Sequence, residues 1–557
     1  MDNYAIADNF SLLSKLIDIH GDDSFKAKSY SAAAFAIEKY PVQLSSLAPE
    51  KVSAIKGVGA AIGKKITEQI STGRLALLDE YVQKTPAGIL ELMRIKGLGP
   101  KKIATIWKEL GIESTGELLY ACEENRLSIC KGFGEKTQQN IQESIKFYTS
   151  NQGSYLYSQI EEFAHDFTKK MKQSFPENII EITGAFNRHA EVIHNLEWVT
   201  NIQTQDLECF FKQNDYEVLI TEDHLAARGS QNVGLQFYYA NNNNVVTQLF
   251  KHNCSTEFFN AWNEKYSWNT NHAYTTEIEI FQQHNLPFIP PFLRETAPII
   301  EKAAMNALPE VIQTGDIKAI IHSHSNWSDG GDTIEAMAQA AVKNGLEYIV
   351  ISDHSQSAFY AKGLYPDRIK AQHLLIDELN EKYKPFKIFK SIESDILNDG
   401  ALDYPDQILD TFDLVITSVH SNLKMTEEKA TTRLLKAIAN PYTTILGHMT
   451  GRLLLSRNGY PVDYEKIIEA CALHNVVIEL NAHPRRLDMD WRHINRAVEK
   501  GILISIDPDA HTVSAFGDIK YGVLAAQKGG LTADNNLSSF TLPQFEDFLK
   551  KQQTKRQ

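Results

Sequence analysis

Short apolar runs, each ending in an ionisable or amide residue, recur through the second half of the chain. Seven such runs begin at Ala319, Tyr348, Ile388, Leu414, Thr444, Val476 and Leu503. Their length and composition predict buried strands, and segments with helical spacing lie between them, for example 333–344 and 464–474. Strands that alternate with helices predict parallel pairing through crossovers, and this pattern indicates an α/β barrel.

The residues at the ends of these runs are of the types that bind metal ions. His322 and His324 follow the first run two apart, so on a strand they point to the same side, and a turn at 328–330 lets Asp329 fold back toward them. The other runs end in Asp353, His354, Glu393, His420, His448, Glu479, Asn481, Asp509 and His511. Parallel strands carry their C-terminal ends to one face, so these side chains are expected to converge there. The alternative, unrelated core and surface residues, needs the same coincidence at six strand ends.

This mixture of imidazoles and carboxylates suits Zn, Mn or Fe rather than Ca or Mg alone. The candidate ligands outnumber what one ion needs, which predicts two or three ions of Mn²⁺ or Zn²⁺. Clustered ions of this kind favour phosphoester hydrolysis, because they activate a water and hold the attacking and leaving oxygens.

These segments resemble the PHP domain (polymerase and histidinol phosphatase), in particular the version at the C-terminus of bacterial X-family DNA polymerases. The matching stretches are 322–324, 328–330, 353–354, 393–397, 418–420, 447–452, 479–482 and 509–511. The resemblance implies a distorted (β/α)7 barrel with three ions. It implies a first ion at His322, His324, Glu393 and Asp509, a second at Glu393, His420 and His448 with Glu393 bridging, and a third at Asp329, His354 and His511. Ile320 replaces an aspartate of the family and Met449 a proline; the first change could remove a partner that orients His322.

The first 150 residues repeat a short glycine motif before helices. Its three copies place glycine pairs at Gly57 and Gly59, Gly97 and Gly99, and Gly132 and Gly134. Such a pair permits a tight turn and leaves backbone N–H groups at a helix N-terminus, where an anion can bind. The nearby cations are Lys64, Lys65, Lys101 and Lys102. Residues 51–110 hold 11 Lys and Arg against 5 Asp and Glu, in an otherwise acidic chain.

This repeat resembles helix-hairpin-helix elements, which grip the DNA backbone without reading sequence. Simple helix caps are the alternative, above all for the third copy, which Glu135 follows. The layout also resembles the lyase-like and fingers regions of X-family polymerases. In that family a lysine after the first hairpin can form a Schiff base with an abasic sugar, and Lys65 holds the matching position. We favour a solvated, phosphate-facing role for Lys65, because Schiff-base lysines need a depressed pKa.

The same resemblance implies a polymerase palm and thumb over residues 151–300, beginning with a strand and turn at 179–185. The family places three carboxylates there to hold two Mg²⁺ ions. The matching positions in this sequence are Asn195, Glu197 and Gln248, with a hairpin loop expected at 241–244. The family's arginine pair is reduced to Asn187 and Arg188. One carboxylate should not hold two Mg²⁺ ions, so we predict a palm that kept its fold and lost nucleotidyl transfer. An active repair polymerase is the alternative if this alignment is wrong.

Composition sets outer limits. A chain of 557 residues is too long to fold around one hydrophobic core, so several domains are expected. Its hydrophobic content of 43% is ordinary for globular proteins. No apolar run reaches 18 residues and the N-terminus lacks a basic, apolar leader, which predicts neither membrane insertion nor secretion. Five scattered cysteines suit a reducing cytoplasm and no zinc finger. The net charge of −14 argues against binding of nucleic acid over the whole surface, but it permits a local basic surface that contacts DNA.

Together these patterns predict a multidomain protein. Residues 1–80 are expected to form an all-α lyase-like domain, 81–150 a fingers-like helix-hairpin-helix domain, 151–305 a degenerate α+β palm and thumb, and 306–557 the PHP barrel.

The predicted function is DNA-binding, metal-dependent phosphodiester hydrolysis by a 3′→5′ exonuclease or related repair nuclease. Glu393 is the expected catalytic residue, and Arg452 a phosphate clamp, with a structural salt bridge as its alternative. Asn481 and Arg485 are further candidates for the same site. The rival functions are a small-molecule phosphomonoesterase and a DNA-binding scaffold with a structural metal cluster.

Overall fold

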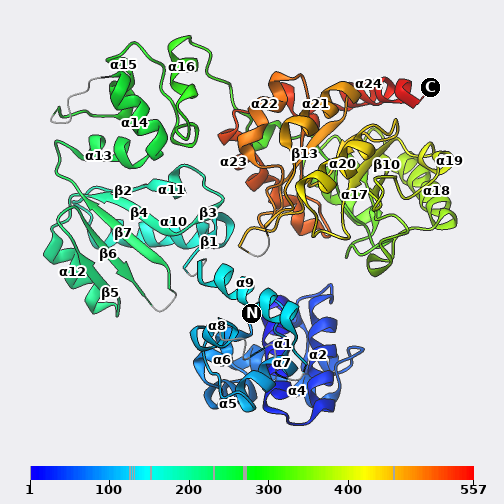
Figure 1. Ribbon diagram of the computed structural model, residues 1–557, viewed down its shortest axis with the longest axis horizontal. Coiled ribbons are helices and arrows are strands. Elements are labelled where there is room, and N and C mark those ends of the chain that lie inside the picture. The colour runs from blue at the N-terminus through cyan, green and yellow to red at the C-terminus, as the bar shows by residue number, and fades with distance from the viewer. Residues whose placement is uncertain are drawn as a thin grey trace. The chain divides into compact units, whose positions relative to one another are not determined.

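The computed structural model describes residues 2–123, 127, 130, 132–150, 153–229, 232–266, 272–455 and 458–556. The chain divides into two compact units, Met1–Gln152 and Gly153–Gln557. Figure 1 shows the helices of the first unit in blue to cyan and the sheets of the second in cyan to orange. Within the described ranges, no helix has the length and apolar character that a membrane span requires.

The first unit is built from helices alone in its described residues. They are α1 Asn3–His20, α2 Ser24–Glu38, α3 Pro49–Ser53, α4 Ala60–Thr72, α5 Ala76–Lys84, α6 Ala87–Leu92, α7 Pro100–Lys108, α8 Thr115–Glu123 and α9 Glu135–Ser150. Polar caps fix the first two: the side chain of Asp2 accepts from the N–H of Ala5, and Asp23 accepts from Phe25. One hydrophobic core lies among α1, α2 and α4, and a second among α6 to α9. The predicted all-α region is confirmed.

The glycine motifs adopt one repeated turn. Gly57, Gly97 and Gly132 have φ of +91°, +88° and +91°, a region that favours glycine. Gly59 and Gly99 then cap the N-termini of α4 and α7. A Cβ on Gly59, Gly99 or Gly134 would meet no atom within 4 Å, so the turns leave their outer face open. Residues 129 and 131 of the third motif lie outside the described residues.

The second unit begins with a mixed five-stranded sheet in the order β2-β4-β7-β6-β5. Its strands are β2 Ile180–Thr183, β4 Asn195–Thr200, β5 Glu217–Ile220, β6 His224–Arg228 and β7 Gly234–Tyr239, beside a small pair of β1 Tyr155–Leu156 and β3 Val192–Ile193. The helices are α10 Tyr157–Ser174, α11 Gly184–Asn187, α12 Thr204–Gln213, α13 Val245–His252, α14 Thr256–Lys265, α15 Glu277–Gln282 and α16 Pro298–Ala304. One core packs α10 and α12 on the sheet, and another joins α13 to α16.

Two expectations for this region are wrong. Residues 241–244 do not form a hairpin loop: the Asn241 side chain accepts from the N–H groups of Asn243 and Asn244, and the turn leads into α13. Gln248 therefore lies on a helix rather than on a strand beside β4. The run around it is short and apolar, and such runs do not distinguish strand from helix.

The rest of the unit is a seven-stranded parallel sheet in the order β14-β13-β12-β11-β10-β9-β8. Its strands are β8 Ala319–Ile320, β9 Tyr348–Ile351, β10 Lys387–Asp395, β11 Leu414–Ser418, β12 Ile445–Leu446, β13 Val477–Asn481 and β14 Ile504–Asp507. The helices are α17 Ile334–Lys343, α18 Pro366–Lys382, α19 Asp406–Leu409, α20 Glu427–Ile438, α21 Tyr464–His474, α22 Ile494–Glu499, α23 Ile519–Lys528 and α24 Leu542–Gln553. A parallel bridge between Ser323 and Ala510 brings the first and last strands together, so the sheet nearly closes into the predicted (β/α)7 barrel.

Alternate residues of these strands fill the barrel interior. Inward positions such as Val350 and Ile416 form one core with Phe545 and Leu549 of α24. The ring of Phe545 stacks on Tyr348, with ring centroids 4.5 Å apart. The outward positions pack under the surrounding helices in a larger core. A filled interior leaves the C-terminal strand ends, here called the barrel mouth, as the place for chemistry.

Candidate metal centre

The carboxylate of Glu393 is the common neighbour of histidines from several strand ends. Glu393 is fully buried near the end of β10. Its Oε1 lies 3.1 Å from Nε2 of both His420 and His448, and 3.5 Å from Nε2 of His322. Its Oε2 lies 2.8 Å from Nδ1 of His354. One carboxylate therefore reaches side chains from four other strands, the arrangement expected of a bridging ligand.

A second carboxylate, Asp509, gathers the two histidines that follow β8. Its Oδ1 lies 3.0 Å from Nε2 of His324 and 3.6 Å from Nε2 of His322. Both histidines are fully buried. Asp509 reaches them from the loop after β14, in a left-handed backbone conformation with φ of +52°. The ligand atoms of these three residues are close enough to share one ion.

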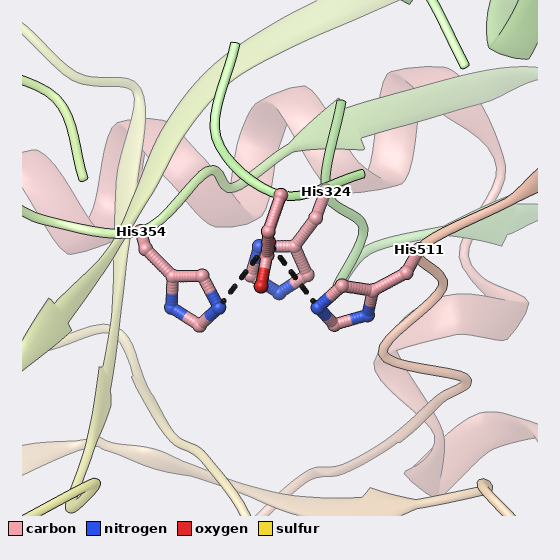
Figure 2. A group of neighbouring side chains, drawn as sticks. His324, His354 and His511 are labelled. Atoms are coloured by element: carbon pink, nitrogen blue, oxygen red, sulfur yellow. Dashed lines mark ion pairs between the residues drawn. The ribbon is translucent and has the colours of Figure 1, made fainter. Parts of the chain in front are cut away.

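The third group is more open to solvent. Oδ1 of Asp329 lies 3.4 Å from Nε2 of His511 and 3.6 Å from Nε2 of His354. Figure 2 shows the rings of His324, His354 and His511, which form one group of possible ligands with Asp329. The side chains of Asp329 and His511 are 32% and 41% exposed, whereas those of the buried groups are at most 12% exposed. A substrate would therefore approach from the Asp329 and His511 side.

The donor set fits bound cations. Two ligands of a tetrahedral ion lie about 3.4 Å apart when each bond is about 2.1 Å. The separations around Asp509 and Asp329 run from 3.0 to 3.6 Å. Within the described residues, buried Nε2 of His322, both ring nitrogens of His324 and both oxygens of Glu393 lack a hydrogen-bond partner. Buried polar atoms in native proteins rarely remain so, and shared cations would satisfy these.

Hydrogen bonds behind the histidines fix their orientation. Nδ1 of His322 bonds Oε1 of Glu479 at 2.6 Å, and Nδ1 of His420 bonds Oδ1 of Asp395 at 2.6 Å. Each bond turns the opposite ring nitrogen toward Glu393. Glu479 thus orients His322 in place of the aspartate that Ile320 replaces. The orienting roles of Glu479 and Asp395 were not expected, although the spacing of Asp395 from Glu393 places both on the same side of a strand.

Asp353 holds the loop that carries His324 and Asp329. It is fully buried and accepts hydrogen bonds from the N–H of Ser325 at 2.8 Å, from Nε2 of Gln372 at 2.6 Å, and from the hydroxyls of Ser325 and Ser328. Four donors on one carboxylate immobilise the loop, so the ligands do not depend on solvent-exposed contacts for their positions.

The charges of the site favour cation binding. Burial alone would raise the pKa of Glu393, but the imidazoles of His420, His322 and His354 outweigh it and hold that pKa well below its usual value. Burial is likewise outweighed at Asp329, where His511 and His354 lower the pKa to about 2. Both carboxylates are therefore anionic at neutral pH and ready to hold a cation.

We expect cation binding to release protons. Burial opposes the charge on His420 and His511, but Glu393 and Asp395 raise the pKa of His420 to about 10, and Asp329 and Asp509 raise that of His511 to about 9. Both rings are thus protonated at pH 7 without a cation, and a ligand nitrogen must lose its proton. Metal affinity should rise about tenfold per pH unit for each proton displaced below these pKa values.

Calorimetric titration of metal-stripped protein with Mn²⁺, in buffers of different ionisation enthalpy, measures this release directly. The observed enthalpy should vary with the buffer, with a slope of more than one proton for each protein molecule saturated. An enthalpy independent of the buffer would contradict the protonated resting state of His420 and His511.

Arg452 is not placed as a phosphate clamp. Its side chain is 15% exposed, and its Nε donates to the carbonyl of Arg486 at 2.9 Å. One terminal nitrogen donates to Asp490 at 2.9 Å, and the other to Glu191 at 2.5 Å and to the carbonyl of Leu487. With all three nitrogens bonded inside the protein, the structure favours the structural salt bridge over the clamp.

A different arginine lies beside the candidate ligands. Nε of Arg486 is 3.7 Å from Oδ2 of Asp509, and its side chain is 22% exposed. Asn481, fully buried, donates to the same oxygen at 3.2 Å. Arg485 is exposed, and no ion pair places its guanidinium at the site in the described structure. Arg485 was the expected residue, and its neighbour Arg486 lies at the site instead. A loop outside a regular strand has no alternation of side chains from which to distinguish the two.

The palm sheet holds a single carboxylate on the two strands where the family needs three. Glu197 lies on β4, and its register partner on the parallel strand β7 is Gln236. No residue of β7 is acidic. Asn195, two positions before Glu197 on the same face, brings no charge. Gln236 on β7 therefore takes the neighbouring-strand position expected of Gln248, and the shortage of carboxylates is unchanged.

Glu197 is itself engaged by the palm. Its Oε2 accepts from the hydroxyl of Tyr238 at 3.0 Å, and its Oε1 from the N–H of Ala185 at 3.4 Å. A Cβ on Gly184 would lie 2.3 Å from the Glu197 carboxylate, so the acid lies directly over this turn. Arg188, the remaining arginine after the turn, pairs with Glu295 at 3.2 Å.

Comparison with known proteins agrees with this architecture. Profiles of the helix-hairpin-helix domain, the SAM-like helix-hairpin-helix tandem and the PHP domain match residues 1–75, 89–146 and 321–483. The chain is 31% identical to the DNA polymerase/3′-5′ exonuclease PolX of Bacillus subtilis (strain 168), over 96% of this chain and 97% of that protein. It is 27% identical to a probable phosphatase of Thermoanaerobacter sp. (strain X514), over 43% of this chain and 98% of that protein.

A helix-hairpin-helix region, a polymerase-like sheet and a PHP barrel in one chain define a DNA-processing enzyme with a hydrolase domain. The chain belongs to the bacterial X-family DNA polymerases that carry a C-terminal PHP domain.

Proposed function

We propose that this protein is a DNA-directed, metal-dependent phosphodiesterase that acts as a 3′→5′ exonuclease and has lost nucleotidyl transfer. The observation that carries the proposal is the contrast between two sites in one unit. The barrel mouth keeps every candidate ligand, gathered around Glu393, Asp509 and Asp329. The palm keeps one carboxylate on β4 and none on β7.

The work divides among four parts of the chain. We assign DNA-backbone binding to the helix-hairpin-helix regions at 1–80 and 81–150, support of the strand to the palm and thumb at 151–305, and hydrolysis to the barrel at 306–557. Sequence-independent contacts suffice for an enzyme that degrades strands of any sequence. The five cysteines are scattered along the chain, which suits a reducing cytoplasm as the place of action.

The barrel residues would hold two or three ions of Mn²⁺ or Zn²⁺. We assign His322, His324, Glu393 and Asp509 to the first, Glu393, His420 and His448 to the second, and Asp329, His354 and His511 to the third. When bound, such ions would supply a hydroxide at neutral pH and offset the charge of the phosphodiester. Glu393 contributes the shared carboxylate, and Arg486, rather than Arg452, offers a cation at the rim for the substrate phosphate.

The direct test is hydrolysis of end-labelled gapped DNA by the purified full chain, with and without added Mn²⁺. We expect stepwise shortening from the 3′ end that depends on the added ion and stops with a chelator. Products that shorten from the 5′ end would refute the assigned polarity. Absence of hydrolysis with Mn²⁺ or Zn²⁺ would refute the nuclease itself.

A phosphomonoesterase is the second candidate, because two probable phosphatases match 43% of this chain over 98% of their own length. A competition assay distinguishes the two functions, in which the same preparation is given labelled DNA together with a chromogenic phosphomonoester. Preference for the monoester would favour the phosphatase. The DNA-binding hairpins in the same chain support the nuclease.

We expect the hairpin lysines to bind DNA phosphates. Lys64 and Lys101 are exposed near the first and second hairpins, whereas Lys65 is half-buried and Lys102 donates to the carbonyl of Gly97 at 3.2 Å. The double change Lys64→Glu and Lys101→Glu should weaken DNA binding and reduce the slope of log affinity against log salt by about 2. Fluorescence anisotropy over a salt series measures both quantities.

Lys550→Glu is the matched control, because Lys550 is exposed on α24 in the other unit. It alters the net charge by the same two units per residue as each hairpin change. A similar loss of affinity in this control would show that overall charge, and not the hairpins, governs binding. We assign Lys65 to phosphate contact as well, in preference to Schiff-base chemistry.

A further inference from the structure

The loop between β9 and α18, residues 355–365, places aromatic side chains in solvent at the barrel mouth. Phe359 is 83% exposed, the highest value among the large hydrophobic side chains of the described residues. Tyr365 is 56% exposed, and Lys362 lies between them and is exposed as well. Exposed aromatic rings with an interleaved cation are the features that bind single-stranded nucleic acid: rings stack on bases and the cation meets the backbone.

This β9–α18 loop is held rigidly. Ala358, Ala361 and Leu364 point inward and are at most 1% exposed. The N–H of Leu364 donates to the carbonyl of His354 at 2.9 Å, which closes the loop on its own beginning. A Cβ on Gly363 would lie 1.8 Å from the carbonyl oxygen of Ser355, so only glycine permits this closure. A ring presented on a fixed backbone loses little freedom on binding.

The same loop is tied to groups that orient the candidate ligands. The hydroxyl of Ser357 donates to Asp395 at 2.7 Å, and Asp395 orients His420. The N–H of Asp395 donates to the hydroxyl of Ser355 at 2.9 Å. His354, a candidate ligand, immediately precedes the loop. The exposed ring is therefore presented from a loop built into the edge of the metal centre.

A second link joins the loop to the segment that carries His324 and Asp329. Arg368, on α18, donates to the carbonyl of Lys362 at 2.9 Å and to the carbonyl of Trp327. Its guanidinium also lies over the Trp327 ring, 5.8 Å from the centroid. Both sides of the loop are thus fixed to segments that bear candidate ligands.

We propose that Phe359 is the base-stacking residue of the hydrolytic site, with Lys362 on the neighbouring phosphate, so that the loop selects single-stranded DNA ends over small phosphate esters. This inference rests on the proposed nuclease function. A small ester offers no base to the ring, whereas a strand end whose terminal phosphodiester enters the barrel mouth carries bases past the rim.

The test compares two substrates that differ only in their bases. One is a 5′-labelled oligothymidine, and the other has the same backbone with tetrahydrofuran abasic residues over its 3′-terminal four positions. With Mn²⁺ and the full chain, Phe359→Ala should lower kcat/KM on oligothymidine roughly tenfold, as expected for loss of one stacked base, and leave the abasic strand unchanged. Phe359→Tyr should retain the wild-type rate on both. Lys362→Gln should lower the rate on both strands, because each carries the phosphate.

Leu473→Ala is the matched control, because Leu473 is 76% exposed on α21 and is not part of the loop. It should behave as wild type. Equal rates of Phe359→Ala and wild type on oligothymidine would overturn the proposal, and so would equal losses on the two substrates. Failure of the wild type to cleave either strand is a different result, which would refute the nuclease function and not the stacking role alone.

Discussion

Replacing Glu393 by Gln is expected to abolish DNA hydrolysis. The change keeps the shape of the side chain and removes the negative charge that lies within 3.6 Å of five histidines. Loss of a partner behind a metal ligand typically lowers affinity or activity by about 10- to 100-fold, and loss of the shared ligand itself should exceed this. The measurement is the rate of Mn²⁺-dependent shortening of end-labelled DNA, together with the metal content of the purified variant.

Two further variants show how large the loss of hydrolysis in Glu393→Gln is by comparison. Glu479→Gln, which weakens the bond that orients His322, should lower hydrolysis by about 10- to 100-fold. Glu381→Gln, at a side chain 74% exposed on α18, should have no effect. Circular dichroism must show that all three variants are folded. If the folded Glu393→Gln variant hydrolysed DNA at the wild-type rate, the metal centre could not be the catalytic site.

The second large effect is an absence: we expect no Mg²⁺-dependent primer extension by the wild-type protein. Two Mg²⁺ ions need several carboxylates, and Glu197 offers one while bonding Tyr238 and Ala185. Gln236, opposite Glu197, adds an oxygen without charge. The measurement is incorporation of labelled nucleotides on a gapped template, with chelator-free buffer and each of Mg²⁺ and Mn²⁺.

Glu197→Ala is the informative companion in that assay. Incorporation by the wild type that disappears in Glu197→Ala would show that the palm still transfers nucleotides. Incorporation that persists in the variant would indicate contamination by another polymerase. Nuclease activity should be the same in both proteins, because Glu197 belongs to the palm sheet and not to the barrel mouth.

The barrel and its candidate ligands could be predicted from sequence because one rule governs both. Parallel strands end on one face, so residues at seven strand ends meet even when 189 positions separate His322 from His511. The structure brings the candidate ligands close to three carboxylates, Glu393, Asp509 and Asp329, and their division among ions stays a prediction. Glu393 also illustrates why single residues stand out: an acid at the end of an apolar run has few purely structural explanations.

The roles that could not be predicted depend on contacts between residues far apart in the sequence, which no local pattern indicates. The role of Arg452 follows from Glu191, 261 positions away, and no spacing rule connects them. Gln248 was misplaced because four apolar or neutral residues fit a strand and a helix equally. The loop that presents Phe359 lacks regular structure over most of its length. Neither the spacing of a helix nor the alternation of a strand could therefore show that its ring points into solvent.

Three ion pairs of the described residues join the palm to the barrel, and the most exposed of them links Lys520 to Glu161 at 2.5 Å. Arg452 pairs with Glu191, and Lys528, only 2% exposed, pairs with Glu295 at 2.6 Å. Excising residues 153–305 would remove Glu295 from Lys528 and Glu191 from Arg452, which would then keep only Asp490 as its anion. The smallest autonomous hydrolase that could be cut from this chain should therefore begin near residue 153 and not at the barrel. The palm and thumb thus support the barrel through contacts that do not depend on nucleotidyl transfer.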